Sequence, residues 1–448
     1  MLLLLIKRGL FKLNSNKYMQ YYSLNGHSPM VDFKEATIKG QAPDKGLYFP
    51  REIAILPKEF VKNIEEYSNE EIAYRLLQPY IGEDIEPGQL RKIVNETINF
   101  PIPLKEIEPS TFILELFHGP TLAFKDVGAR FMSRCLSWFA SGHDRKIIVL
   151  VATSGDTGGA VASSFYEVPN VEVVILYPSG KVSPIQEKQL TTPGKNIHAL
   201  EIAGNFDDCQ ALVKKAFADN DLTRKLFLTS ANSINVARWL PQQVYYALAW
   251  KQWPYKNEPP VVSVPSGNFG NICAGLLAHL SGIPVKRFIA ACNANDVIPQ
   301  YFQTGNRISK PAVPTASNAM DVADPSNFIR ILELFERNLD NVKAKVCATT
   351  SSDAETAATI HEVFQQYNYT LDPHTAVAWN GLNKNRSHGE KGIVIGTAHP
   401  IKFPDFVEYN TGSKLAYPPS VQSLLSLDAS STQMKVDYPD LKEFLLAF

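Results

Sequence analysis

The sequence lacks the features that mark several large classes of protein. Lysine and arginine total 44 and aspartate and glutamate total 45, so the net charge of −1 gives no basic surface for nucleic acid or an anionic membrane. No apolar run reaches the roughly 18 residues that a membrane-spanning helix needs. The five cysteines form no CxxC pair, so neither a zinc site nor a disulfide framework is expected, and a cytoplasmic location fits. The nine histidines form no HExxH motif, so no metal site is expected.

The first residues do not match a secretory signal. Met1 to Ile6 are apolar, but this run is short, and Lys7 and Arg8 follow it instead of preceding it. We interpret residues 1–18 as an extension that is either disordered or spurious, with Met19 as an alternative start. A short targeting segment is the other interpretation.

The 448 residues are enough for two or three domains with a sizeable core. Residues 19–105 contain many proline and glycine turns, and their apolar spacing predicts short helices over residues 57–67 and 69–78. We therefore place a domain boundary near residue 105. An α/β region is predicted over residues 106–410, and a tail with a terminal helix over residues 411–448.

From Lys146 onward, the pattern of strand, turn and helix repeats along the chain. The run Ile147–Ala152 is wholly apolar and rich in β-branched residues, as expected of a strand that is buried on both faces. Such strands alternating with helices predict a parallel α/β sheet with right-handed crossovers. One long helix is predicted from about Asn235 to Trp253, in which Pro241 is tolerated only because it falls near the first turns. Further strands are predicted at residues 171–177, 197–202, 261–264, 287–292, 345–349 and 392–396.

One lysine lies in an unusual setting, in the segment His118-Gly-Pro-Thr-Leu-Ala-Phe-Lys125-Asp126. The Gly-Pro pair predicts a turn and the spacing after it predicts a helix over residues 127–139, so Lys125 would lie on a loop or first helical turn. An ammonium group between apolar neighbours such as Phe124 loses hydration, which lowers its pKa and makes the amine a nucleophile toward a carbonyl. The alternative is a surface lysine that pairs with Asp126, which is the commoner situation for a single lysine.

Three other loops follow predicted strands, at the edge of an α/β sheet where ligands bind. Thr153-Ser-Gly-Asp-Thr-Gly-Gly159 offers hydroxyl and N–H donors to an anion, although Ser, Asp and Thr also cap ordinary helices. Ser266-Gly-Asn-Phe-Gly-Asn271 would suit a phosphate, but it lacks the GxGxxG and GxxxxGK[ST] spacings, and a tight turn is the alternative. In Gly396-Thr-Ala-His-Pro-Ile-Lys-Phe403, the Thr397 hydroxyl could bond a ring nitrogen, whereas a single histidine such as His399 is more often structural.

A buried lysine and a phosphate-binding loop have one economical explanation. An aldehyde cofactor that carries a phosphate would react with the lysine and anchor its phosphate in the loop. Pyridoxal 5'-phosphate is such a cofactor, and we predict that this protein binds it.

Together these motifs resemble threonine synthase of the bacterial and fungal type. The resemblance rests on the Lys125 segment, the loops at residues 153–158, 267–271 and 396–400, and Ser230-Ala-Asn-Ser-Ile-Asn235 with Arg238. It extends from about Met19 to about Tyr409. It implies an α/β enzyme of fold type II, similar to the β-subunit of tryptophan synthase, with two parallel-sheet domains and an N-terminal, mostly helical domain. It also implies the last step of threonine biosynthesis, in which O-phospho-L-homoserine and water become L-threonine and phosphate.

The resemblance implies a role for several residues in binding the cofactor. Lys125 is similar to the lysine that forms the Schiff base and later moves protons, and Phe124 lies beside it. Thr397 matches the hydroxyl near the pyridine nitrogen. The loop for the cofactor phosphate corresponds to Gly267, Asn268, Phe269, Gly270 and Asn271.

The resemblance also implies two sets of substrate contacts. Asn232, Ser233, Asn235 and Arg238 are candidates for the substrate phosphate, and a guanidinium suits it because it can bind phosphate through two parallel hydrogen bonds. Many relatives of the wider fold have asparagine where Asp156 stands, and an anionic side chain would act differently there. The substrate carboxylate would meet the loop formed by Thr153, Ser154, Gly155, Asp156 and Thr157.

Two other functions stay open on the sequence alone. A related phospho-lyase would eliminate phosphate without adding water correctly, which gives a 2-oxo acid and ammonia. A non-catalytic paralogue would only bind a metabolite, although Lys125 and all three glycine-containing loops are intact. In each case the expected partner is a small molecule, with no nucleic acid or membrane, and the protein is expected to be a monomer or homodimer.

Overall fold

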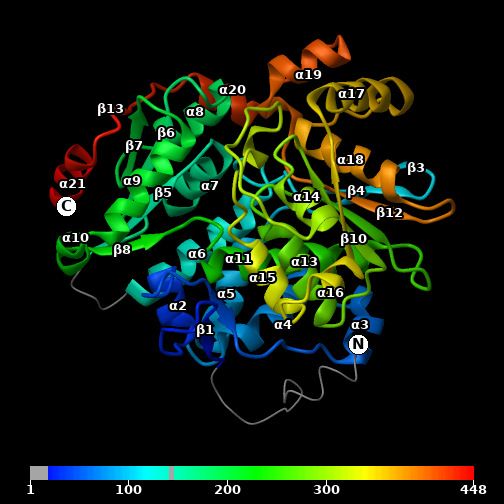
Figure 1. Ribbon diagram of the computed structural model, residues 1–448, viewed down its shortest axis with the longest axis horizontal. Coiled ribbons are helices and arrows are strands. Elements are labelled where there is room, and N and C mark those ends of the chain that lie inside the picture. Colours follow the sequence, from blue (N-terminus) through cyan, green and yellow to red (C-terminus); the bar gives the residue numbers. More distant parts are fainter. Residues whose placement is uncertain (1–18, 141–145) are drawn as a thin grey trace.

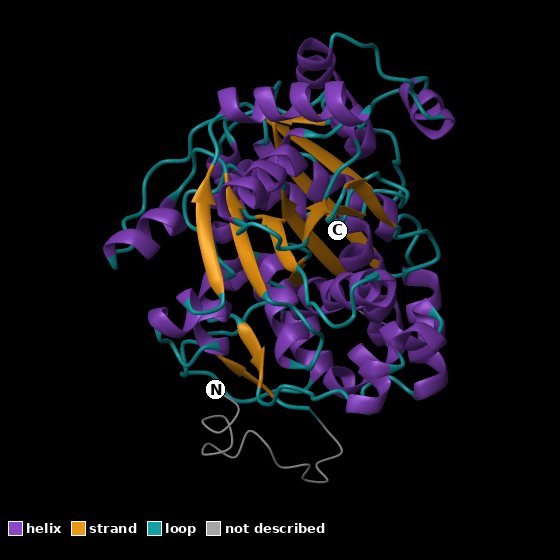
Figure 2. Ribbon diagram, turned by 90° about the vertical axis from the view of Figure 1, so that its right-hand side faces the viewer, coloured by secondary structure: helices purple, strands orange, loops and turns teal. Residues whose placement is uncertain are grey.

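The computed structural model describes residues 19–140 and 146–448, and the predicted extension at residues 1–18 lies outside them. Two largely parallel sheets with their helices form the body of the molecule, and a smaller, mostly helical segment packs below them in Figure 1. Figure 2 shows the strands lying between layers of helices. None of the helices in the described ranges is long and apolar enough to cross a membrane.

The N-terminal segment is mostly helical, as predicted, and has one antiparallel pair of short strands. The helix predicted over residues 57–67 is divided into an α-helix and a 3₁₀ turn, whereas the helix predicted over residues 69–78 continues to Ile81. Ser68 caps that second helix by accepting a hydrogen bond from the backbone N–H of Glu71. The elements are β1 (Tyr21–Ser23), α2 (Phe33–Lys39), β2 (Tyr48–Pro50), α3 (Lys58–Lys62), η2 (Ile64–Glu66), α4 (Asn69–Ile81) and α5 (Pro87–Thr97).

The larger sheet has six strands in the order β11-β10-β9-β12-β4-β3, and its neighbours are parallel except for β3 and β4. The sequence prediction omits these two strands. The apolar run of β4 lies between Thr111 and Glu115 and is too short to indicate a strand. β3 contains mostly charged residues, and it spans the domain boundary predicted near residue 105. The strands are β3 (Leu104–Glu108), β4 (Thr111–Glu115), β9 (Val261–Pro265), β10 (Arg287–Cys292), β11 (Val346–Thr350) and β12 (Gly392–Gly396).

The second sheet has five parallel strands in the order β13-β7-β6-β5-β8. Its strand at Ile147–Ala152 is buried along its whole length, as the sequence predicts. The sequence analysis does not predict strands β8 and β13, because both are short and partly exposed. One of them belongs to the C-terminal tail, so the tail adds an edge strand to this sheet. The strands are β5 (Ile147–Ala152), β6 (Val171–Pro178), β7 (Ile197–Ile202), β8 (Phe227–Ser230) and β13 (Thr432–Met434).

Helices connect the strands, and several of them begin with a capping motif. Capping boxes begin α8, α9 and α17, where the cap side chain and the third helical residue bond each other's backbone. The helix predicted from Asn235 to Trp253 is interrupted by a 3₁₀ turn, because Pro241 has no N–H to continue the helical hydrogen bonds. The helices are α6 (Lys125–Ala140), α7 (Asp156–Phe165), α8 (Pro184–Thr191), α9 (Phe206–Ala218), α10 (Asn220–Lys225), α11 (Val236–Trp239), η3 (Leu240–Gln242), α12 (Gln243–Gln252), α13 (Gly270–Leu280), α14 (Val297–Thr304), η4 (Asn318–Met320), α15 (Phe328–Leu334), α16 (Leu339–Lys343), α17 (Asp353–Tyr367), α18 (Pro373–Asn385), η5 (Pro400–Lys402), α19 (Pro404–Thr411), α20 (Pro419–Leu425) and α21 (Tyr438–Leu446).

A buried arginine joins the N-terminal segment to the α/β body. Arg330, in α15, donates hydrogen bonds from Nη2 to the carbonyls of Tyr48 (3.0 Å) and Ile234 (2.6 Å). Its Nη1 donates to Asn327 Oδ1 at 2.7 Å, and the guanidinium lies 4.5 Å from the centre of the Trp239 ring. Because the acceptors on Tyr48 and Asn327 are buried, loss of the donor would leave them without compensation.

Replacing Arg330 with methionine should therefore lower the free energy of unfolding by about 3 kcal/mol. Denaturant unfolding of the purified protein measures this change. Arg224→Met is the matched control, since Arg224 is exposed and its Nε donates to Asn220 in the same short helix. The control should change the stability by no more than about 0.5 kcal/mol. Similar losses in the two variants would contradict the connecting role of Arg330.

Candidate active site

A cavity of about 490 Å³ lies where the strand ends of the two sheets meet. The loops after β5, β9 and β12 and the start of α6 contribute to its wall. Ligands of α/β proteins bind beyond the carboxyl ends of the strands, so this is the expected place for a site. The sequence-predicted site residues that line the cavity are Phe124, Lys125, Thr153, Ser154, Asp156, Thr157, Asn232, Ser233, Arg238, Gly267, Asn268, Phe269, Gly270, Asn271 and Thr397.

Lys125 is the first residue of α6, in agreement with the prediction that it lies on a loop or first helical turn. The loop before it is held by the exit of β12. The backbone N–H of Phe124 donates to the carbonyl of Thr397 at 2.8 Å, and Ala123 forms an antiparallel bridge with Ala398. These bonds fix the lysine beside the loop that carries Thr397.

The surroundings of Lys125 disfavour a positive charge on it. Burial is the main reason why the pKa of Lys125 falls to about 8. The carboxylate of Asp156, 4.0 Å from Nζ, opposes this fall, whereas the charges of Lys402 and Arg238 add to it. Near neutral pH, Lys125 is therefore a free amine more often than an ordinary lysine is.

The alternative left by the sequence, an ion pair between Lys125 and Asp126, does not form in the structure. The Asp126 carboxylate accepts hydrogen bonds from the backbone N–H and the hydroxyl of Thr121, and these hold the turn before α6. A Cβ atom on Gly119 would lie 2.4 Å from Asp126 Oδ2, so the turn needs glycine at that position. Asp126 thus shapes the loop that presents the lysine.

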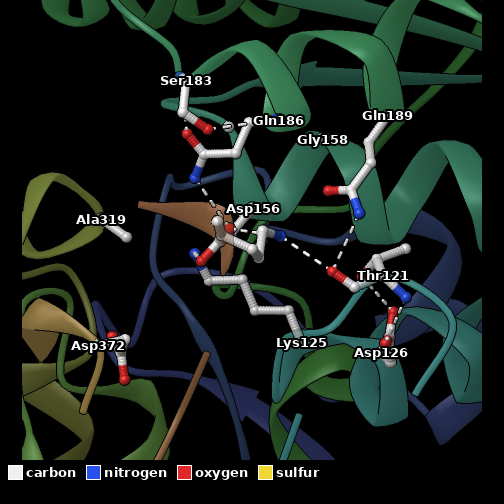
Figure 3. Close-up of polar contacts among 12 residues, drawn as sticks. Thr121, Lys125, Asp126, Asp156, Gly158, Ser183, Gln186, Gln189, Ala319 and Asp372 are labelled. Atoms are coloured by element: carbon white, nitrogen blue, oxygen red, sulfur yellow. Dashed lines mark hydrogen bonds and ion pairs between the residues drawn. The ribbon is translucent and has the colours of Figure 1, made fainter. Parts of the chain in front are cut away.

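Asp156 begins α7 and lies beside Lys125, as Figure 3 shows. Its Oδ1 accepts hydrogen bonds from Lys402 Nζ at 2.7 Å and from Gln186 Nε2 at 2.9 Å. Burial by itself would raise the pKa of Asp156, but the ammonium groups of Lys402 and Lys125 hold it well below its usual range. Asp156 is therefore an anion. The sequence assigns no role to Lys402, because nothing local in the sequence marks a lysine as buried.

The loop Gly267–Asn271 leads into α13 with the geometry of an anion site. Phe269 has a left-handed backbone with a φ of 59°, and a Cβ atom on Gly267 would lie 2.5 Å from the Cα of Met320. Within the described part of the chain, the buried Nδ2 of Asn271 has no hydrogen-bond partner. This free donor and the N–H groups at the helix N-terminus fit the phosphate of pyridoxal phosphate.

Asn268 ties this loop to neighbouring segments. Its Nδ2 donates to Ser233 Oγ at 2.7 Å, and its Oδ1 accepts from the backbone N–H of Ser326 at 2.6 Å. Asn327 Nδ2 also donates to Ser233 Oγ, at 3.1 Å. Because Ser233 accepts both bonds, its own hydroxyl hydrogen is left to donate to an acceptor in the cavity.

Arg238 places a buried positive charge on the same cavity. Its Nη1 donates to the carbonyl of Ala231, while its Nε has no partner among the residues that the structure describes. Gly128 makes room for it, since a Cβ atom there would lie 2.6 Å from the Arg238 carbonyl oxygen and 3.2 Å from Nε. Burial lowers the pKa of Arg238 to about 10, so the group stays charged near neutral pH and can bind an anion.

Two predicted site residues, Asn235 and Gly155, are not among those that line the cavity. Asn235 Nδ2 donates to the carbonyls of Thr37 (2.8 Å) and Ser230 (3.1 Å), and its Oδ1 accepts from the N–H of Ala237. Both hydrogens of Asn235 Nδ2 are donated within the protein, so the predicted direct contact with the substrate phosphate is not supported. Asn235 instead caps the start of α11. Gly155 shapes the loop before α7, with a φ of 129° that favours glycine.

One cavity residue, His374, has no counterpart in the sequence prediction. Its Nδ1 lies 2.8 Å from Asp372 Oδ1, and its Nε2 accepts a hydrogen bond from the N–H of Ala319 at 3.2 Å. The only local signal is the Asp-Pro start of α18, which predicts a helix but no cavity. His399 accepts a hydrogen bond from the N–H of Ile401, which supports its interpretation as a structural residue.

Three family models match stretches that together span most of the chain. The model for the threonine synthase N terminus matches residues 20–98. The model for pyridoxal-phosphate dependent enzymes matches residues 101–397, which include Lys125 and the loop at residues 267–271. The model for the threonine synthase C-terminal region matches residues 375–445.

Full-length relatives agree with these matches. The threonine synthase of Serratia marcescens is 43% identical over 429 residues, which cover 96% of this chain and 99% of the relative. The crystal structure of threonine synthase from Escherichia coli has a TM-score of 0.90 at 42% identity and covers 96% of this chain and 100% of that chain. The crystal structure of a threonine synthase from Brucella melitensis with bound PLP has a TM-score of 0.90 at 34% identity and covers 95% of this chain and 98% of that chain. The predicted fold class and cofactor are thereby confirmed, and the chain belongs to the threonine synthase family of pyridoxal-phosphate-dependent enzymes.

Proposed function

We propose that this protein converts O-phospho-L-homoserine and water into L-threonine and inorganic phosphate. The observation that carries this proposal is a single cavity with a lysine of lowered pKa and two separate places for an anion. One place is the N-terminus of α13 with Asn271, and the other is the guanidinium of Arg238. The first suits the phosphate of the cofactor and the second suits the phosphate of the substrate.

Pyridoxal phosphate, when bound, supplies an electron sink for negative charge on the carbon atoms of the substrate. The loop Gly267–Asn271 would hold its phosphate, and Lys125 with Phe124 would lie at its aldehyde. The Thr397 hydroxyl would face the ring nitrogen. Since a hydroxyl can either donate or accept a hydrogen bond, Thr397 does not require that nitrogen to carry a proton, as a carboxylate would.

Lys125 would also act as the base that moves protons at Cα and Cβ of the substrate. With a pKa of about 8, its amine can accept a proton near neutral pH and its ammonium form can return it. Its side chain is flexible, so one nitrogen can reach neighbouring carbon atoms in turn. Phosphate would leave from Cγ and water would add at Cβ, which gives threonine.

The loop that begins α7 would receive the substrate carboxylate. Thr153, Ser154 and Thr157 offer hydroxyl groups on the cavity wall, and Gly155 permits the tight backbone turn. Asp156 is an anion and would repel a carboxylate, so its neighbours would make this contact.

The substrate phosphate would bind at Arg238. Ser233, whose hydroxyl hydrogen is available, would add a second donor. Asn232 Nδ2 already donates to the carbonyl of Ala152 at 3.0 Å, so Asn232 would act mainly by fixing the wall.

A phospho-lyase would need the same cofactor and the same phosphate contacts. Full-length relatives named as threonine synthases favour threonine over a 2-oxo acid as the product. A cavity lysine whose pKa is lowered by burial argues against a non-catalytic paralogue. A cytoplasmic location and a monomeric or homodimeric state stay predictions.

Lys125→Ala should lower kcat with O-phospho-L-homoserine by at least about 100-fold, because the base and the covalent anchor of the cofactor are both lost. Threonine and 2-oxobutyrate are quantified in parallel, and the unmodified protein should give threonine. Lys345→Ala is the control, because that lysine donates to the carbonyls of Val285 and Lys286 at the opposite end of the sheet. An active Lys125→Ala variant would refute the role of the lysine, and 2-oxobutyrate as the sole product would refute the proposed reaction.

Arg238→Met should lower kcat/KM for O-phospho-L-homoserine by about 10- to 100-fold, since it removes charged hydrogen bonds to the phosphate. Steady-state kinetics measure this, and the visible absorbance of the bound cofactor reports whether the cofactor site persists. Arg130→Met serves for comparison, because Arg130 donates to Glu96 and Asn99 away from the cavity. If Arg238→Met binds cofactor and keeps the original kcat/KM, the phosphate does not bind at Arg238.

A further inference from the structure

A second buried lysine has no part in the reaction proposed above. Lys402 lies in η5, and its side chain has no exposed surface. Its Nζ lies 2.7 Å from Asp156 Oδ1 and donates to the carbonyl of Thr121 at 3.0 Å. Because Lys402 lies behind Asp156 and not on the cavity wall, a contact with substrate does not explain it.

The hydrogen bonds of Lys402 are not its distinctive contribution. Gln186 Nε2 donates to the same oxygen of Asp156 at 2.9 Å, and Gln189 Nε2 donates to the same carbonyl of Thr121 at 3.1 Å. Figure 3 shows both glutamines directed at these acceptors. Each acceptor therefore already has a neutral amide donor. What Lys402 adds is positive charge.

A positive charge matters at this point because Asp156 is a buried anion next to Lys125. Asp156 Oδ2 lies 4.0 Å from Lys125 Nζ, and a carboxylate at this distance favours the ammonium form of its neighbour. An ammonium group has no electron pair with which to attack an aldehyde. Lys402 approaches the carboxylate more closely than Lys125 does and offsets its charge.

We propose that Lys402 is a positioning residue whose buried ammonium group offsets the charge of Asp156 and so increases the fraction of Lys125 that is the free amine able to bind pyridoxal phosphate. The inference rests on the proposed function only in that Lys125 is the cofactor-binding lysine. In that step, the Lys125 nitrogen forms a double bond with the aldehyde carbon, and the aldehyde oxygen leaves with the two amine hydrogens as water. Lys402 acts through the charge of Asp156 and takes no part in bond formation.

Other charged groups around this cluster do not replace Lys402. Among the described residues, Lys125 and Lys402 are the cations within 4.0 Å of the Asp156 carboxylate. Arg238 faces Lys125 and would itself disfavour the ammonium form, and it is unchanged in the variants below. Other titratable groups around the cluster are Asp126 and Arg130 on α6, Glu115 at the end of β4, Asp372 and His374 at the start of α18, and His118 and His399 in the loops after β4 and β12.

The test measures how fast cofactor-free, full-length protein captures pyridoxal phosphate as a function of pH. The rate rises as Lys125 loses its proton, so the pH of half-maximal rate follows the pKa of Lys125. Lys402→Met should raise this midpoint by about one to three pH units, because Asp156 then stabilises only the Lys125 ammonium. Below the midpoint, capture should slow about tenfold for each unit of the shift. Titration of the free cofactor is common to every variant and cancels in the comparison.

Three further variants separate charge from packing. Lys402→Gln keeps a hydrogen-bond donor without the charge and should raise the midpoint of capture by the same amount. It replaces Lys402→Met in the test if that variant does not fold. The double variant Asp156→Asn with Lys402→Met removes both charges, so its midpoint should return to the original value or below it. Lys345→Met removes a lysine at the opposite end of the sheet and should leave the midpoint unchanged.

An unchanged midpoint in Lys402→Met and Lys402→Gln would overturn the proposal, as would a raised midpoint that persists in the double variant. The assay contains no substrate, so a failure to form threonine would refute the proposed function without affecting this result. If the unmodified protein captured no cofactor at all, the role of Lys125 itself would be refuted, and the proposal for Lys402 with it.

Discussion

An ammonium group at Lys125 would lie in a cavity wall with little access to water, where its charge is costly. This burial takes the pKa of Lys125 to about 8 and makes the amine available near neutral pH. The neighbouring carboxylate of Asp156 works in the opposite direction, and Lys402, on the other side of that carboxylate, offsets it. The protonation of one nitrogen thus depends on side chains that come from α6, α7 and η5. The anion sites of the cavity are useful only if this nitrogen can react.

Sheet order explains why these distant segments meet. β4 and β12 are parallel neighbours in the larger sheet, so the loops that follow them leave from the same edge. Beyond the strands, an antiparallel bridge between Ala123 and Ala398 and the bond from the Phe124 N–H to the Thr397 carbonyl join these two loops. They place Lys125 opposite the loop that leads to Lys402. β5, in the second sheet, delivers Asp156 from the other side. The cavity therefore requires both sheets, as its position at their carboxyl ends indicates.

The sequence predicts the parts of the site that have local signals. Gly119 and Pro120 mark the turn before Lys125, and the glycines of the 267–271 loop mark a close approach to a ligand. Lys402 and His374 depend on long-range contacts and carry no such signal. Asn235 has the residue type of a ligand but caps α11, because an asparagine side chain serves both purposes equally well. The buried strands of the sheets are also predictable, whereas β8 and β13 exist because neighbouring strands supply their hydrogen bonds.

The central claim is that one particular amine holds the cofactor, and chemical trapping tests it most directly. The cofactor-loaded protein is reduced with borohydride and digested, and the peptide that carries the pyridoxyl group is identified by mass spectrometry. The account predicts the label on the peptide that contains Lys125, at the end of the segment from His118. A label on Lys402, which lies in the same cluster of charges, or on any other lysine would contradict it.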